Sequence, residues 1–131
     1  MKNFEDDKHL LNNSSMDTLH REFLDIYNSV NINNKEDYRA KLITLLEHSK
    51  NHFQLEESMM DRFSYKTAKE HKEEHTKVLN EMEYFIKLSI NSFGLNMLKS
   101  YYKEKLPYWF DLHLISMDSD LAYHLKGFEN I

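Results

Sequence analysis

The sequence predicts an all-α protein, built as an antiparallel up-down-up-down bundle of four helices. Glycine and proline are scarce, with 2 and 1 residues among 131, which disfavours a sheet with many turns. Apolar residues recur at spacings of three and four in four separate stretches, as they do on one face of a helix. The polar breaks between these stretches are short, and short connections join antiparallel neighbours in helix bundles.

Length, charge and composition narrow the class of protein further. A chain of 131 residues fits one domain with a substantial core. The net charge of −5 comes from interspersed acidic and basic residues, and no basic stripe indicates a nucleic-acid partner. The absence of cysteine excludes disulfides, thiolate metal sites and cysteine nucleophiles. No segment has the apolar run of a membrane span or a signal peptide, so we expect a cytoplasmic protein without a membrane partner.

The first predicted helix follows an N-terminal arm at residues 1–13, which has no clear period. The bundle domain therefore spans residues 14–131. Ser14 and Ser15 offer an N-cap for this helix. Its inward stripe is Met16, Leu19, His20, Phe23, Tyr27 and Val30.

The second predicted helix begins near Glu36, after an asparagine-rich loop at residues 31–35. Its inward positions alternate between spacings of four and three: Tyr38, Leu42, Leu45, Ser49, His52, Glu56, Met59 and Phe63. A break follows at residues 64–66. The third helix then has the stripe Ala68, His71, His75, Val78, Met82, Phe85 and Ser89.

The fourth predicted helix follows a turn at residues 91–94. Its inward stripe is Leu95, Leu98, Tyr102, Leu106, Trp109 and His113. Pro107 interrupts this pattern, because proline in a helix interior removes a hydrogen bond. We therefore expect a bend there, or a helix restart just before Trp109. We also expect the helix to loosen soon after His113.

Polar residues on the four inward stripes indicate a metal site. Burying a polar side chain costs several kcal/mol unless it is paired, and neutral imidazole and carboxylate are natural metal ligands. One inward histidine is commonly a core residue with a hydrogen-bond partner, but five on four converging stripes favour metal binding. The residues concerned are His20, His52, Glu56, His71, His75 and His113. Outside the stripes, we expect surface positions for His9, His48, His124, Glu57, Glu70, Glu73 and Glu74.

The spacing of these residues narrows the choice of metal. His52 and Glu56 lie four residues apart, as do His71 and His75, so each pair can converge on one ion or on two adjacent ions. Five nitrogens exceed what a tetrahedral zinc ion needs, and with carboxylates added the supply suits two iron ions. A zinc-protease H-E-x-x-H motif is absent, because Lys72 follows His71. A ferritin-like Glu-x-x-His motif is absent as well.

The ordered set H…HxxxE…HxxxH…HxxxxD resembles the hemerythrin family, in particular its single-domain bacterial members. That family comprises non-haem di-iron oxygen binders. The matching pieces cover the chain from about residue 16 to residue 118, in family order. They are MDTLHREF (16–23), HFQLEESMM (52–60), HKEEH (71–75) and WFDLHLISMD (109–118).

The resemblance implies a ligand set for two iron ions that share an oxo or hydroxo bridge. One iron would be bound by His71, His75 and His113. The other would be bound by His20 and His52 and would keep a vacant position, with Glu56 and Asp118 bridging the pair. Asp118 lies five residues beyond His113, so the helix must end or unwind for both to reach the metals. The resemblance also implies that dioxygen binds reversibly at the vacant position, where both irons reduce it to a hydroperoxide.

Apolar residues beside the ligands would form a dry oxygen pocket: Phe53, Trp109, Phe110, Phe23 and Leu24. The function implied is oxygen storage, delivery or sensing rather than catalysis on a second substrate. An electron donor or an oxygen-using enzyme would be the protein partner. Two alternatives stay open, namely a di-iron redox enzyme acting on peroxide or nitric oxide and a non-catalytic metal store. The oligomeric state is not readable from the pattern.

Overall fold

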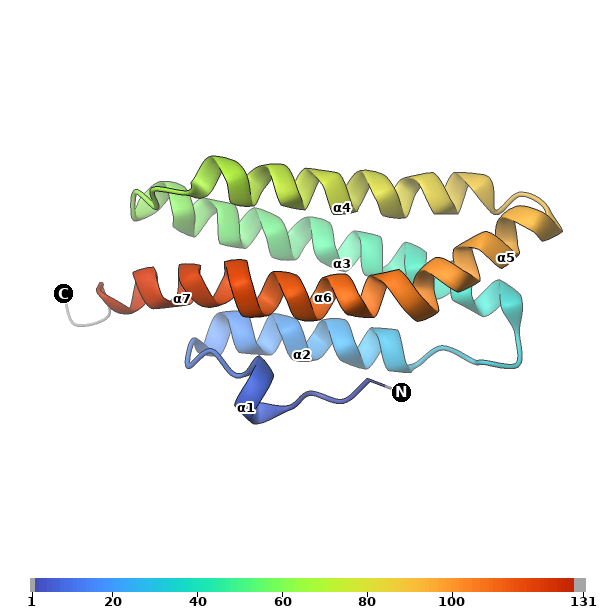
Figure 1. The fold of residues 1–131 in the computed structure, drawn as a ribbon, viewed down its shortest axis with the longest axis horizontal. Coiled ribbons are helices and arrows are strands. Elements are labelled where there is room, and N and C mark those ends of the chain that lie inside the picture. Colours follow the sequence, from blue (N-terminus) through green and yellow to red (C-terminus); the bar gives the residue numbers. More distant parts are fainter. Residues whose placement is uncertain (1, 129–131) are drawn as a thin grey trace.

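The protein is a helical bundle, as predicted. The computed structural model describes residues 2–128, and it contains no strand within that range. The helices form four rows, and Figure 1 shows the rows lying side by side along the longest axis of the molecule. Three rows are single helices, and the fourth is a continuous run of shorter segments. The three single helices are α2 (Ser14–Asn28), α3 (Lys35–Arg62) and α4 (Ala68–Leu88).

The N-terminal arm contains a short helix, α1 (Asp6–His9). Asn13 is the N-cap of α2, since its side-chain oxygen accepts a hydrogen bond from the Met16 amide at 3.1 Å. The predicted cap at Ser14 or Ser15 was therefore wrong by one or two residues. Asp17 in the first turn is buried and accepts a hydrogen bond from the Leu11 amide at 2.8 Å, which ties the arm to α2.

The fourth row begins with α5 (Ser92–Ser100), η1 (Tyr101–Lys105) and α6 (Leu106–His113). The segment η1 is a turn of π-helix, in which the Leu106 amide donates to the Tyr101 carbonyl five residues earlier. Pro107 is the second residue of α6 and follows η1 directly, and the backbone stays helical through Lys105 and Leu106. The expected helix restart just before Trp109 therefore does not occur.

The fourth row does not loosen after His113, and that expectation was wrong. A second π-helical turn, η2 (Leu114–Asp118), leads directly into α7 (Ser119–Lys126). No glycine or proline occurs between Pro107 and Gly127, so nothing in the local sequence ends the helix. The helix continues instead, with one extra residue in the π-helical turn.

The buried apolar side chains form two clusters. On three of the rows, one buried polar residue has an apolar residue three or four positions away on each side. One of these two apolar residues belongs to the first cluster and the other to the second. Met16 and Phe23 flank His20 on α2, and Met60 and Phe53 flank Glu56 on α3. In the fourth row, Leu121 and Leu114 flank Asp118 in the same way. A layer of buried polar residues therefore lies between the two apolar clusters.

Along residues 2–128, no helix is both long enough and apolar enough to cross a membrane. The last three residues of the predicted bundle domain, 129–131, lie outside the described residues.

Candidate metal centre

The polar layer brings together all seven side chains predicted as ligands, and each of them is buried. Their donor atoms form two overlapping groups, in each of which all donor atoms lie within 4.8 Å of one another. Glu56 belongs to both groups. The five-residue group is Glu56, His71, His75, His113 and Asp118, and the three-residue group is His20, His52 and Glu56. Such a set of imidazoles and carboxylates could hold a metal ion.

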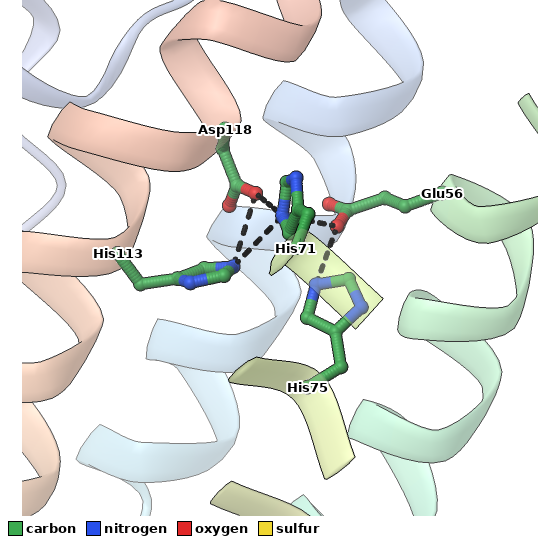
Figure 2. Close-up of side chains that lie close together, drawn as sticks. All are labelled: Glu56, His71, His75, His113 and Asp118. Carbon is green, nitrogen blue, oxygen red and sulfur yellow. Dashed lines mark hydrogen bonds and ion pairs between the residues drawn. The ribbon is translucent and has the colours of Figure 1, made fainter. Parts of the chain in front are cut away.

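The five-residue group has the spacing of ligands around one ion. Figure 2 shows its side chains converging from α3, α4 and the fourth row. His71 Nε2 lies 3.2 Å from His113 Nε2 and 3.0 Å from Asp118 Oδ1, and the latter two atoms are 3.1 Å apart. Ligands about 2.1 Å from a metal and at right angles to each other stand about 3.0 Å apart. These three atoms therefore form a triangle that fits one face of an octahedron.

The segment η2 explains how His113 and Asp118 reach the same place. In an ordinary α-helix, residues four apart lie on one face, and a residue five apart is turned away. A π-helical turn bonds each amide to the carbonyl five residues earlier. Here the Ser119 amide donates to the Leu114 carbonyl, and the wider turn puts both side chains on the inner face. The helix widens without ending.

The three-residue group lies on the other side of the same carboxylates. His52 Nε2 is 2.6 Å from Glu56 Oε2, and His20 Nε2 is 2.9 Å from Asp118 Oδ2. The other oxygen of Glu56, Oε1, faces His75. The other oxygen of Asp118, Oδ1, faces His71 and His113. Each carboxylate thus presents one oxygen to each set of imidazoles.

Two donor atoms at the centre are buried without a hydrogen-bond partner. Glu56 Oε1 and His75 Nε2 lie 3.2 Å apart but are not aligned for a hydrogen bond. A buried polar atom left in this way costs about 1–3 kcal/mol. A cation between the two atoms would accept a lone pair from each, so the donor set fits a metal ion.

The charges of the cluster also suit a cation. Burial, the largest single influence, raises the pKa of Glu56, and so does the charge of Asp118, but the neighbouring imidazoles, His52 foremost, together outweigh them and bring this pKa to about 2. Burial likewise raises the pKa of Asp118, but His113 and its hydrogen bond hold the net value well below the usual range. Both carboxylates are therefore anionic at neutral pH, and a metal ion would compete with protons for the imidazoles around them.

A small cavity adjoins the three-residue group. Its volume is about 10 Å³, close to the minimum for one water molecule. Four of the five predicted pocket residues line it: Phe23, Phe53, Trp109 and Phe110. The fifth, Leu24, packs in the apolar core, and Leu114 lines the cavity instead. The other lining residues are ligand candidates, namely His20, His52, His113 and Asp118.

His9 supports one wall of this cavity, and the expectation that it lies on the surface was wrong. Its side chain is fully buried, and its ring packs against Phe110 with the ring centroids 5.7 Å apart. Nε2 lies 2.8 Å from Asp111 Oδ1, and Nδ1 accepts a hydrogen bond from the Glu5 amide at 2.8 Å. Residues 1–13 have no hydrophobic period, so no sequence signal marked this position.

Two glutamates expected on solvated faces also contact the centre from outside. Glu57 Oε2 lies 2.9 Å from Nδ1 of His75. Trp109 Nε1 donates to Glu74 Oε1 at 3.1 Å, and its indole stacks on the His113 ring at 4.8 Å. The other two glutamates of that expectation are exposed as predicted: Glu70 and Glu73.

Comparison of this chain with models of protein families, with curated proteins and with solved structures gave no match.

Proposed function

We propose that this protein binds dioxygen reversibly at a non-haem di-iron centre, in the manner of the hemerythrin family. The observation that carries the proposal is the placement of the two carboxylates. Glu56 and Asp118 each present one oxygen to either set of imidazoles, as bridging ligands do. Two iron ions in these positions would supply the electrons for binding dioxygen, with an oxo or hydroxo group between them.

The proposed ligand sets are unequal, and the inequality supports small-molecule binding on one side. The iron at the five-residue group would take three imidazoles, His71, His75 and His113, together with both carboxylates. The iron at the three-residue group would take only two, His20 and His52. That iron would therefore keep a position for an external ligand.

The cavity lies at the side with the open position. His20 and His52 line it together with four aromatic residues, and so do His113 and Asp118 of the five-residue group. Its volume of about 10 Å³ corresponds to about one water-sized molecule. Aromatic walls exclude water, which slows the loss of a bound oxygen species and the irreversible oxidation of iron. Substrates larger than dioxygen, nitric oxide or peroxide do not fit, so the cavity restricts the ligands of this side to very small molecules.

The proposed fold is the antiparallel up-down-up-down bundle of that family. The turn after α3 and the turn after α4 lie at opposite ends of the molecule in Figure 1, which supports alternating helix directions. Alternation lets residues distant in sequence face each other at one level. His20, Glu56 and His71 would meet in this way.

The decisive experiment follows the visible spectrum of iron-loaded protein through cycles of oxygen exposure. The protein is reduced without oxygen, exposed to air, and then deoxygenated again. We expect a charge-transfer band that appears with oxygen and disappears on its removal, because binding is reversible. His52→Ala should lose the band, whereas His124→Ala, outside the cluster, should keep it.

Other outcomes would contradict the proposal. Irreversible oxidation with rapid consumption of peroxide or nitric oxide would indicate a redox enzyme. A colourless protein that retains one zinc ion in place of iron would indicate a metal store.

A further inference from the structure

Three side chains of one helix lie against the imidazole of His75. Phe53, Glu56 and Glu57 all lie on α3 within five residues, so they share one face of that helix. Phe53 stacks on the ring face, with centroids 3.8 Å apart and planes 1° from parallel. Glu56 Oε1 lies 3.2 Å from Nε2, and Glu57 Oε2 lies 2.9 Å from Nδ1.

The contact with Glu57 fixes which nitrogen of His75 carries the proton. An ionised carboxylate only accepts hydrogen bonds, and a neutral imidazole has one N–H. Glu57 Oε2 is placed for a hydrogen bond with Nδ1, whereas Glu56 Oε1 is not aligned for one with Nε2. Nδ1 therefore donates to Glu57, which leaves the lone pair of Nε2 directed into the cluster. Glu57 is about one third exposed, so its carboxylate stays hydrated while it holds the ring.

The other imidazoles of the five-residue group lack such a partner. The Nδ1 atoms of His71 and His113 are buried with no hydrogen bond, and so is that of His20 in the three-residue group. His75 is therefore distinguished by an anionic acceptor behind its ring. Such an acceptor makes an imidazole a stronger donor to a metal, and losing it typically weakens metal binding 10–100-fold.

We propose that Glu57 is a positioning residue, which fixes His75 with Nε2 free and gives the five-residue group its higher metal affinity. The assignment rests on the metal centre put forward above. It goes beyond that function because it specifies which of the two ions is bound first and held more tightly. Glu57 itself touches no metal, since its carboxylate lies on the far side of the His75 ring.

The first test reads the tautomer directly in metal-free protein, by long-range ¹⁵N–¹H NMR of the imidazole nitrogens. We expect His75 with its proton on Nδ1 in the parent protein and in Glu47→Gln. Glu47 is exposed on the same helix, so this control removes the same charge without touching the cluster. In Glu57→Leu, the proton should redistribute toward Nε2. An unchanged tautomer in Glu57→Leu would overturn the proposal.

The second test uses cobalt(II) alone as a probe, titrated into metal-free protein and followed by visible absorption. Glu57→Leu should weaken the tighter binding step about 10–100-fold, and the weaker step should keep its affinity. Glu57→Gln keeps the shape and can still accept the Nδ1 proton, so its loss should be smaller. Circular dichroism verifies that each variant is folded.

Equal cobalt affinities in Glu57→Leu and Glu47→Gln would overturn the assignment. This result is separate from the test of oxygen binding, because cobalt affinity and the tautomer need neither iron nor oxygen. A protein that never binds oxygen but responds to Glu57→Leu as described would refute the proposed function alone. A reversible oxygen band combined with no response to Glu57→Leu would refute the role of Glu57 alone.

Discussion

Each imidazole of the cluster turns its Nε2 atom inward, so each histidine supplies one donor atom to a defined side. His52 Nε2 faces Glu56 Oε2, whereas His71 and His113 face Asp118 Oδ1. Replacing a single histidine should therefore remove a ligand from one group and leave the other group intact. The three-residue group has fewer donors to lose.

Metal content should respond to substitutions in this order. In iron-loaded protein we expect about two ions per chain, and His52→Ala should reduce the content to about one, because only one imidazole would remain for the ion of the three-residue group. His75→Ala should instead disturb the ion of the five-residue group. Elemental analysis after removal of loose metal measures both variants, with His124→Ala as the control. Counts near two in all three variants would show that the ligands are wrongly assigned.

The inward residues were predictable because a buried position recurs at helical spacing. His20, His52, His71, His75 and His113 all lie on apolar stripes. The residues around them were not predictable in this way. Glu57 forms a hydrogen bond with a residue of another helix. A polar residue beside the inward face shows the same local sequence pattern whether or not it has such a partner. His9 lies in a segment without any period.

Among the elements, the two π-helical turns determine where the fourth row places its side chains. Neither turn carries a glycine or a proline, so composition gave no sign of the extra residue in each. The five-residue spacing of His113 and Asp118 did indicate an irregular winding. That spacing requires the helix to end or unwind, and the sequence does not distinguish these outcomes from a π-helical turn, which is rare.

Gly94 sets the approach of α5 to the end of α4. A Cβ atom at this position would lie 1.6 Å from the Leu88 carbonyl oxygen and 2.5 Å from its carbon, and backbone atoms cannot move aside cheaply. Gly94→Ala should therefore lower the free energy of unfolding by about 1–3 kcal/mol or more. Alanine favours a helix by only about 1 kcal/mol over glycine, which does not offset the overlap. Urea denaturation measures the difference.

Gly127→Ala is the matched control for that variant. Its Cβ would meet no atom closer than 3.4 Å, namely the His124 carbonyl oxygen. The change should stay within about 0.5 kcal/mol. Equal stabilities of the two variants would mean that the turn between α4 and α5 has more room than the structure gives it.

Across the whole molecule, tyrosines join the helices away from the metal centre. Tyr27 donates its hydroxyl to the Tyr102 carbonyl at 3.0 Å, and Tyr102 donates to the Tyr27 carbonyl at 2.8 Å. Burial raises the pKa of Tyr27 to about 12, and it raises the pKa of Tyr102 further. Burial and the hydrogen bond to Asp120 raise the pKa of Tyr65 to about 12.

The protein should therefore lose stability in alkaline solution. Unfolded tyrosine ionises near pH 10, while the buried hydroxyls stay protonated. The stability that these groups contribute is complete below pH 10, and it is lost as the pH rises through the higher values of the folded state. Urea denaturation between pH 8 and about pH 11 should show a plateau followed by a decline. A free energy of unfolding that stays constant over this range would contradict the assigned burial.

The extra residue in η2 has a mechanical consequence. His113 and Asp118 are the first and last side chains of one six-residue stretch of backbone, and both reach the same three-atom triangle only while that stretch keeps its wide turn. A cation bound by both side chains would stabilise the π-helical turn, because a return to ordinary α-helical geometry would move one of the two donor atoms away from the cation. Loading with metal should then stiffen α7 as well as the centre itself.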